Sequence, residues 1–165
     1  MTLVDCTVAR HAEAILDILN EAIANSTALY EYEPRSLASM HEWFAARASR
    51  GYPVLGIEGD DGALLGFASY GVFRAYAAFQ YTVEHSVYVQ VDHRGRGIGE
   101  RLLRALIDRA RQQGLHVLVG GLDASNQASI ALHRKLGFVP AGVITQAGFK
   151  FGRWLDLAFW QLTLP

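Results

Sequence analysis

The sequence has a single cysteine, little net charge and no long apolar run, and each shortage excludes a class of protein. Cys6 is the only cysteine among 165 residues, so no disulfide can form within the chain, which is typical of a reducing compartment. The amino terminus lacks a basic segment followed by a long apolar run, and no stretch reaches the length of a membrane span. The formal net charge of −1 gives no overall attraction to nucleic acid or membranes. We therefore expect a cytoplasmic protein without nucleic-acid or membrane partners.

What is present is typical of one compact domain. Hydrophobic residues make up 51% of the chain and charged residues 19%, which excludes a disordered protein. No repeat, low-complexity tract or linker interrupts the sequence, so we expect one domain over residues 1–165. Hydrophobic periodicity predicts the order β-α-α-β-β-β-α-β-α-β-β. The expected elements are a strand at 3–10, helices at 12–25 and 37–48, strands at 52–58, 64–72 and 81–91, a helix at 97–113, a strand at 115–122, a helix at 127–136, and strands at 138–145 and 154–164 around a turn at 148–152.

The most informative local signal is the glycine-rich run Arg94-Gly95-Arg96-Gly97-Ile98-Gly99, which lies between a predicted strand and a predicted helix. Glycines let backbone N–H groups approach a ligand closely, and a helix start attracts anions, so the run predicts a pyrophosphate site. A dinucleotide-binding turn would follow the first strand, and a nucleotide-triphosphate loop would need Gly-Lys-Ser or Gly-Lys-Thr. A tight turn with solvated arginines is the remaining alternative.

Two motifs give the chain a resemblance to a known family. The run Arg94–Gly99 resembles the R/Q-x-x-G-x-G/A signature of the GNAT acetyltransferases, and Asn126–Phe138 resembles their second signature, N-x-x-[SA]…GF. The segments Tyr81–Val89 and Lys150–Asp156 are similar to the branch that contains phosphinothricin acetyltransferase and the enzymes that acetylate methionine sulfone and methionine sulfoximine. This resemblance extends over nearly the whole chain.

The resemblance implies a fold and a cofactor. The fold class would be α/β with a mixed sheet: a GNAT fold with a mostly antiparallel, twisted sheet of about seven strands and about four helices. The co-substrate would be acetyl-CoA, with no metal, and a homodimer is possible for this family. The residues implied to hold acetyl-CoA are Val87, Tyr88, Val89, Arg94, Gly95, Arg96, Gly97, Ile98, Gly99, Glu100 and Asn126.

Two residues are candidates for the acid–base chemistry. Glu84 lies on the less apolar face of its strand and, by the family role, would remove a proton from the amine; the alternative is a structural carboxylate paired with an arginine. His133 stands where many GNAT enzymes place a tyrosine that protonates the departing thiolate, and an imidazole could do the same. The alternative for His133 is a packed or capping residue.

The implied substrate site draws on several segments. Arg74 could clamp an α-carboxylate with its planar fork, or it could be a solvated loop arginine. Lys150 could line the site or occupy a turn, and His85 could be a buried, hydrogen-bonded histidine although the family places it near the substrate. The full set of expected substrate-binding residues is Arg74, Ala75, Tyr76, Glu84, His85, Ser86 and Lys150.

The expected activity is transfer of an acetyl group from acetyl-CoA to the α-amino group of a small amino acid analogue, without a covalent enzyme intermediate. The first alternative is a protein or peptide N-acetyltransferase, which would need an open peptide groove. The second is a non-catalytic GNAT domain that only binds acyl-CoA. Glu84 and His133 favour an enzyme, because a pure binding protein needs neither.

Overall fold

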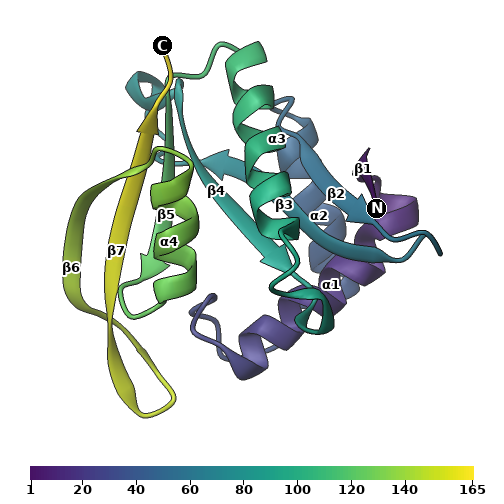
Figure 1. Ribbon diagram of the computed structural model, residues 1–165, viewed down its shortest axis with the longest axis horizontal. Coiled ribbons are helices and arrows are strands. Elements are labelled where there is room, and N and C mark those ends of the chain that lie inside the picture. Colours follow the sequence, from purple (N-terminus) through teal and green to yellow (C-terminus); the bar gives the residue numbers. More distant parts are fainter.

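A seven-stranded sheet forms the centre of the molecule, and helices cover both of its faces (Figure 1). The computed structural model describes residues 1–165. The order of elements is the predicted one. The elements are β1 (Thr2–Asp5), α1 (Val8–Asn25), α2 (Leu37–Ala48), β2 (Val54–Glu58), β3 (Leu64–Val72), β4 (Thr82–Val89), α3 (Ile98–Gln112), β5 (Val117–Asp123), α4 (Gln127–Lys135), β6 (Val139–Lys150) and β7 (Arg153–Thr163).

The first strand is shorter and the first helix longer than predicted, because Thr7 caps the helix. Thr7 has extended backbone angles, φ −119° and ψ 154°, and its Oγ1 accepts a hydrogen bond from the Arg10 amide at 3.3 Å. This satisfies one of the amides that a helix start leaves without a partner. The expected strand is therefore wrong beyond Asp5, and the helix begins at Val8 instead of residue 12.

The ends of β4 and β6 also differ from the prediction. The strand expected to reach Val91 ends at Val89, because residues 91–93 form one turn of 3₁₀ helix before the glycine-rich run. The turn expected at 148–152 is confined to Phe151 and Gly152, both with positive φ, so β6 extends to Lys150. The hairpin formed by β6 and β7 is therefore longer than its hydrophobic pattern indicates.

The strands lie in the order β1-β2-β3-β4-β5-β7-β6, and every neighbouring pair is antiparallel except β4 and β5. This confirms the predicted mixed, mostly antiparallel sheet. Helices α3 and α4 lie on one face, and α1 and α2 lie on the other (Figure 1). On the first face, Leu102, Leu103 and Leu106 of α3 are fully buried, and on the second Ile15 of α1 packs with Met40 of α2.

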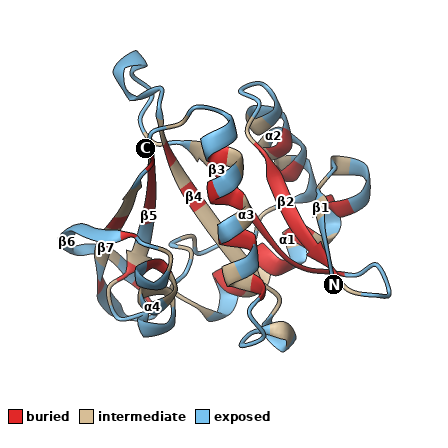
Figure 2. Ribbon diagram, turned by 45° about the horizontal axis from the view of Figure 1, so that its top comes forward, coloured by how far each residue is buried: buried red, intermediate tan, exposed pale blue.

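Burial is uneven across the sheet. Strands β2 and β3 are buried along most of their length, whereas most of β6 and its turn are exposed (Figure 2). The middle of β6 also loses regular register with β7 between Ile144 and Gly148. None of the helices combines the length and the apolar character that crossing a membrane would require.

The parallel pair β4 and β5 positions the candidate site. Their ladder joins only Thr82–Glu84 to Val117–Val119, although β4 continues to Val89 and β5 to Asp123. Beyond Glu84 the two strands separate, so the edge of β4 that faces β5 is not paired with a strand there. Side chains alternate along β4, and Tyr88 packs with the α1–α2 core while Val87 and Val89 pack with the α3 core.

Candidate active site

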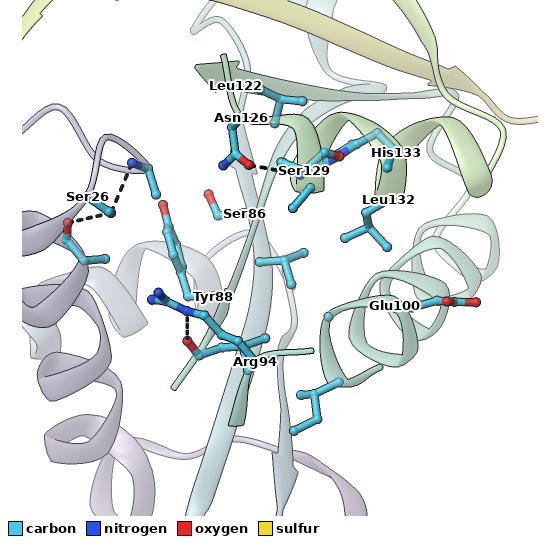
Figure 3. Close-up of a pocket in the computed structure, with 18 of the residues that line it drawn as sticks. Ser26, Ser86, Tyr88, Arg94, Glu100, Leu122, Asn126, Ser129, Leu132 and His133 are labelled. Atoms are coloured by element: carbon cyan, nitrogen blue, oxygen red, sulfur yellow. Dashed lines mark hydrogen bonds between the residues drawn. The ribbon is translucent and has the colours of Figure 1, made fainter. Parts of the chain in front are cut away.

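A cavity of about 720 Å³ lies where β4 and β5 separate. It is lined from both faces of the sheet, by α1 and residues 26–28 on one side and by α3 and α4 on the other (Figure 3). It therefore passes through the sheet. The cavity brings together the predicted residues His85, Ser86, Val87, Tyr88, Val89, Arg94, Gly95, Gly97, Ile98, Gly99, Glu100, Asn126 and His133.

The glycine-rich run forms an open cradle at one end of this cavity. Gly95 and Gly97 have φ of 75° and 78°, a conformation that side chains with a Cβ rarely adopt. A Cβ at either position would meet no other atom within 4 Å, so the backbone is open to a ligand. Gly97 directly precedes α3, whose first N–H groups have no partner within the helix. These features fit a diphosphate group bound through main-chain amides.

Charged side chains fix the rim of the cradle. Arg94 Nη2 donates to Glu21 of α1 at 3.1 Å. Arg94 Nε donates to the Val89 carbonyl at 3.3 Å (Figure 3). The carboxylate of Glu100 accepts from Lys135 at 2.7 Å and from Arg104, and these bonds lower the pKa of Glu100. Because that carboxylate is occupied, the group that Glu100 offers an anion is its main-chain N–H. Arg96 does not line the cavity.

Asn126 lies across the cavity from the cradle and caps α4. Its Oδ1 accepts from the Ser129 amide at 3.1 Å (Figure 3). The oxygen is thus used by the helix start, and the Nδ2 amide hydrogens remain to donate to a ligand. Such a donor matches the amide carbonyls of a pantetheine chain.

The closed end of the gap between β4 and β5 holds two buried imidazoles. His133 Nδ1 lies 2.7 Å from the Ser129 carbonyl oxygen, and His133 Nε2 lies 2.9 Å from His85 Nε2. Burial lowers the pKa of both rings, that of His85 to about 3 with His133 as the second cause. Both nitrogens of His133 are engaged. Because a carbonyl can only accept, the proton of the neutral ring lies on Nδ1, so donation from His133 to a thiolate requires this N–H to leave the Ser129 carbonyl first.

Glu84 shares the face of β4 that carries Ser86 and Tyr88, but it does not line the cavity itself. It lies opposite Val119 at the last pair of the β4–β5 ladder, where the gap begins. Burial raises the pKa of the Glu84 carboxyl, and no ion pair with an arginine or lysine opposes this change. A carboxylate with a raised pKa is a stronger base than an exposed one.

Besides Glu84, four predicted substrate-binding residues lie outside the cavity. Arg74, Ala75 and Tyr76 are exposed in the loop between β3 and β4. Lys150 is only 4% exposed, and its Nζ donates to three main-chain carbonyls, those of Ile23, Ser26 and Leu29. Lys150 thus supports the segment that forms the α1 side of the cavity.

The cavity also contains residues that sequence reasoning missed. Asp123, at the end of β5, accepts hydrogen bonds from Thr27 and Ser125, and it joins the segment after α1 to the sheet. No local pattern marks this contact, because its partners are 96 positions apart in the chain. Residues of α4 could have been found by their helical spacing from Asn126 and His133; those that line the cavity are Ala128, Ser129, Ala131, Leu132 and Lys135.

An anion cradle at a helix start opens into a cavity that passes through the sheet between two parallel strands. Amide donors are present along the cavity, and no cysteine lines it. This arrangement fits the class of proteins that bind a long ligand with a diphosphate group at one end.

Comparison with known proteins identifies the family. The model of the acetyltransferase (GNAT) family matches residues 14–138. An L-methionine sulfoximine/L-methionine sulfone acetyltransferase of Pseudomonas paraeruginosa is 54% identical over 150 residues, which cover 91% of this chain and 87% of the relative. The chain therefore belongs to the GNAT acetyltransferase family, and it is an N-acetyltransferase.

Two crystal structures are also similar. A GNAT superfamily phosphinothricin acetyltransferase from Sinorhizobium meliloti, in complex with acetyl-CoA, has a TM-score of 0.95 and 38% identity, covering 99% of this chain and 88% of that one. A ribosomal-protein-alanine N-acetyltransferase from Brucella melitensis has a TM-score of 0.96 and 44% identity, covering 99% of this chain and 100% of that one.

Proposed function

We propose that the protein transfers the acetyl group of acetyl-CoA directly to the α-amino group of a small amino acid analogue of the methionine sulfone, methionine sulfoximine or phosphinothricin type. The observation that carries the proposal is the cavity through the sheet, with its main-chain cradle at one end. The names of the relatives at 54% and 38% identity supply the substrate class.

Acetyl-CoA supplies an activated thioester when it is bound. The amides of Gly95–Glu100 would hold its diphosphate, Asn126 Nδ2 would donate to the pantetheine chain, and the unpaired edge of β4 at Val87–Val89 would donate to the thioester region. A main-chain N–H aimed at the thioester oxygen stabilises the negative charge that develops there during attack. The proposed chemistry uses no metal.

Glu84 is the proposed general base. An ammonium group cannot attack a thioester, so the amine must first lose a proton. Burial of Glu84 and its freedom from ion pairs support this role. Because Glu84 lies at the start of the gap and outside the cavity lining, we infer that it acts through a water molecule or through Ser86, which does line the cavity.

His133 remains the predicted proton donor for the leaving thiolate, and it would donate from Nδ1 once this N–H leaves the Ser129 carbonyl. The roles of Arg74, Ala75 and Tyr76 in binding the amine substrate also remain predictions. Their loop precedes Thr82 and so lies at the Glu84 end of β4, which supports a place beside the acceptor. For Lys150 we favour a supporting role, because its three carbonyl partners leave no free N–H.

A peptide or protein amino terminus is the second candidate acceptor. It is favoured by the similar structure that is named a ribosomal-protein-alanine N-acetyltransferase. The acetyl donor and the chemistry would be the same, and only the acceptor would differ.

Thiol release from acetyl-CoA with a panel of amines tests the proposal. The panel contains methionine sulfone, methionine sulfoximine, phosphinothricin and a peptide with an amino-terminal alanine. We expect release with at least one of the three amino acid analogues. Thiol release with the peptide alone would establish the second candidate. If acetyl-CoA binds but no amine in the panel causes thiol release, both candidates are refuted.

We further propose that the enzyme works in the cytoplasm as a homodimer. The single, half-buried Cys6 supports a reducing compartment. Support for a dimer comes from large apolar side chains exposed on the β6–β7 hairpin, namely Val143, Ile144, Phe149, Phe151 and Trp154.

A further inference from the structure

Two histidines from distant parts of the chain form one packed unit beside the candidate site. His85 of β4 and His133 of α4 are 5% and 4% exposed, and their ring centroids are 5.1 Å apart. Phe138 packs against both rings at 5.1 and 5.0 Å. A Cβ at Gly120 of β5 would lie 3.0 Å from atoms of both rings, so a larger residue there would press on the pair, and glycine leaves it room.

The hydrogen bonds around the pair determine where its protons lie. The Ser129 carbonyl can only accept, so His133 Nδ1 carries a proton. A buried, neutral His133 then has a lone pair at Nε2, and the 2.9 Å contact requires His85 Nε2 to be the donor. Donation in the other direction would need a proton on both nitrogens of His133, which places a cation among apolar groups.

The remaining nitrogen supports the same assignment. His85 Nδ1 is buried without a hydrogen-bond partner. In the assigned tautomer this atom is an unprotonated acceptor. In the opposite one it would be an unpaired buried N–H, and orphaned donors are rarer in proteins than under-used acceptors. The network is therefore Nε2–H of His85 to Nε2 of His133, and Nδ1–H of His133 to Ser129.

We propose that His85 is a positioning residue: its Nε2–H holds the His133 imidazole in one orientation and one neutral tautomer against the acyl-carrier site. The kinetic importance of this role rests on the proposed function, because it needs a reaction beside His133. The assignment of the protons is independent of the proposed function. A fixed imidazole matters at such a site, since displacements of about 1 Å among reacting groups can cost about 10²-fold in rate.

Nitrogen-15 NMR of the labelled wild-type protein at neutral pH tests the proton assignment without any substrate. Long-range proton–nitrogen correlations distinguish the two nitrogens of each ring. We expect the proton of His133 on Nδ1 and that of His85 on Nε2. A proton on His133 Nε2, or an imidazolium signal for either ring, would overturn the inference.

A pair of variants tests positioning. His85→Gln retains an N–H near the position of Nε2, whereas His85→Leu removes the donor. We expect His85→Leu to lower kcat at least ~10-fold with KM for acetyl-CoA changed less than ~3-fold, and to introduce a new ionisation in the kcat–pH profile near neutrality as His133 loses its partner. His85→Gln should keep kcat within ~3-fold of the wild type and preserve the profile.

The inference is wrong if the leucine variant matches the wild type in kcat and pH profile. It is also wrong if the glutamine variant is as slow as the leucine variant although its melting temperature shows that it is folded. Failure of the proposed function is distinguishable from either outcome. In that case the wild type acetylates no amine, while the NMR spectrum still decides where the protons lie.

Discussion

Glu84 and His133 are both withdrawn from solvent, yet their surroundings give them different acid–base properties. Glu84 is half-buried without a charged partner, which raises the pKa of its carboxyl and makes it a stronger base. His133 is buried with both ring nitrogens engaged, and burial lowers its pKa. Of the two predicted catalytic residues, Glu84 is thus the one with a free acid–base group.

Replacing Glu84 with glutamine tests its role as the base. We expect Glu84→Gln to lower kcat by about 10²-fold or more while acetyl-CoA affinity by calorimetry stays unchanged. In the wild type, kcat/KM should fall as pH drops through the raised pKa of Glu84, because the protonated carboxyl accepts no proton. That acidic limb should be missing in the variant.

The exposed Glu42 of α2 provides a matched control for this experiment. Glu42→Gln removes the same charge far from the β4–β5 gap and should retain wild-type rates. An unchanged rate in Glu84→Gln would exclude Glu84 from the mechanism.

At this scale, local motifs indicated residues that line the cavity. Gly95 and Gly97 were predicted from the preference of a tight turn for glycine, and Asn126 from the resemblance of its segment to the second family signature. The role of Lys150 was not predictable, because its carbonyl partners lie 121 to 127 positions away. The direction in which a lysine points depends on tertiary packing.

Among the elements, the β6–β7 hairpin and the end of α1 depend on each other. Lys150, at the end of β6, donates to carbonyls of Ile23, Ser26 and Leu29 at 2.7 to 2.9 Å, and the Tyr32 hydroxyl donates to the Phe149 carbonyl. The cation thus satisfies carbonyls that the end of α1 leaves without partners. Because residues 26–28 line the cavity, the hairpin holds one wall of the site in place.

Replacing Lys150 with methionine tests this connection. Lys150→Met removes the ammonium and leaves buried carbonyls unpaired, so we expect a loss of about 1–3 kcal/mol in the free energy of unfolding. We also expect weaker acetyl-CoA binding, because the α1 wall loosens. Urea unfolding and calorimetry measure the two effects.

Arg153→Met on the same hairpin is the control. Arg153 is exposed, and its nearest carboxylate oxygen, on Asp123, is 3.8 Å away, so its loss should change stability by less than about 1 kcal/mol. Equal effects of the two substitutions would show that Lys150 has no special supporting role.

Helices and strands were predicted well wherever one face carries apolar residues at a regular spacing. Helix α2 has the bounds that its apolar spacing predicts, and in the structure the Ser36 hydroxyl caps its start by accepting from the Ser39 amide. The prediction failed where a single cap or turn decides the boundary, as at Thr7 and at Phe151. The spacing of apolar residues does not indicate where a helix cap or a turn residue lies.

The stability of the whole molecule should depend on pH through the buried histidine pair. The pKa of His85 is depressed to about 3, whereas an unfolded chain leaves it near 6.5. Between these values the unfolded state binds the extra proton, so stability is fully present above about pH 6.5 and is lost as the pH falls toward 3. The slope for one such group approaches about 1.4 kcal/mol per pH unit.

Chemical unfolding of the wild type and of His85→Gln between pH 7 and pH 4 checks this dependence. The glutamine does not titrate, so the difference in unfolding free energy between the two proteins should shift steadily in favour of the variant as the pH falls. A constant difference across this range would mean that His85 is not held neutral by the fold.

The overall architecture was predictable as an order of elements and, through two motifs, as a family fold. The separation of β4 from β5 was not predictable. The alternation of apolar and polar residues along Tyr81–Val89 is the same whether or not a neighbouring strand pairs with the whole segment. The cavity arises from that separation, so its residues on α1 could not be assigned from sequence.

The opening between β4 and β5 has a further consequence for how the reaction is organised. Since residues from both faces of the sheet line it, a donor held on one side and an acceptor held on the other would have room to be present together. Direct transfer between them would then need no acyl group to be stored on a side chain.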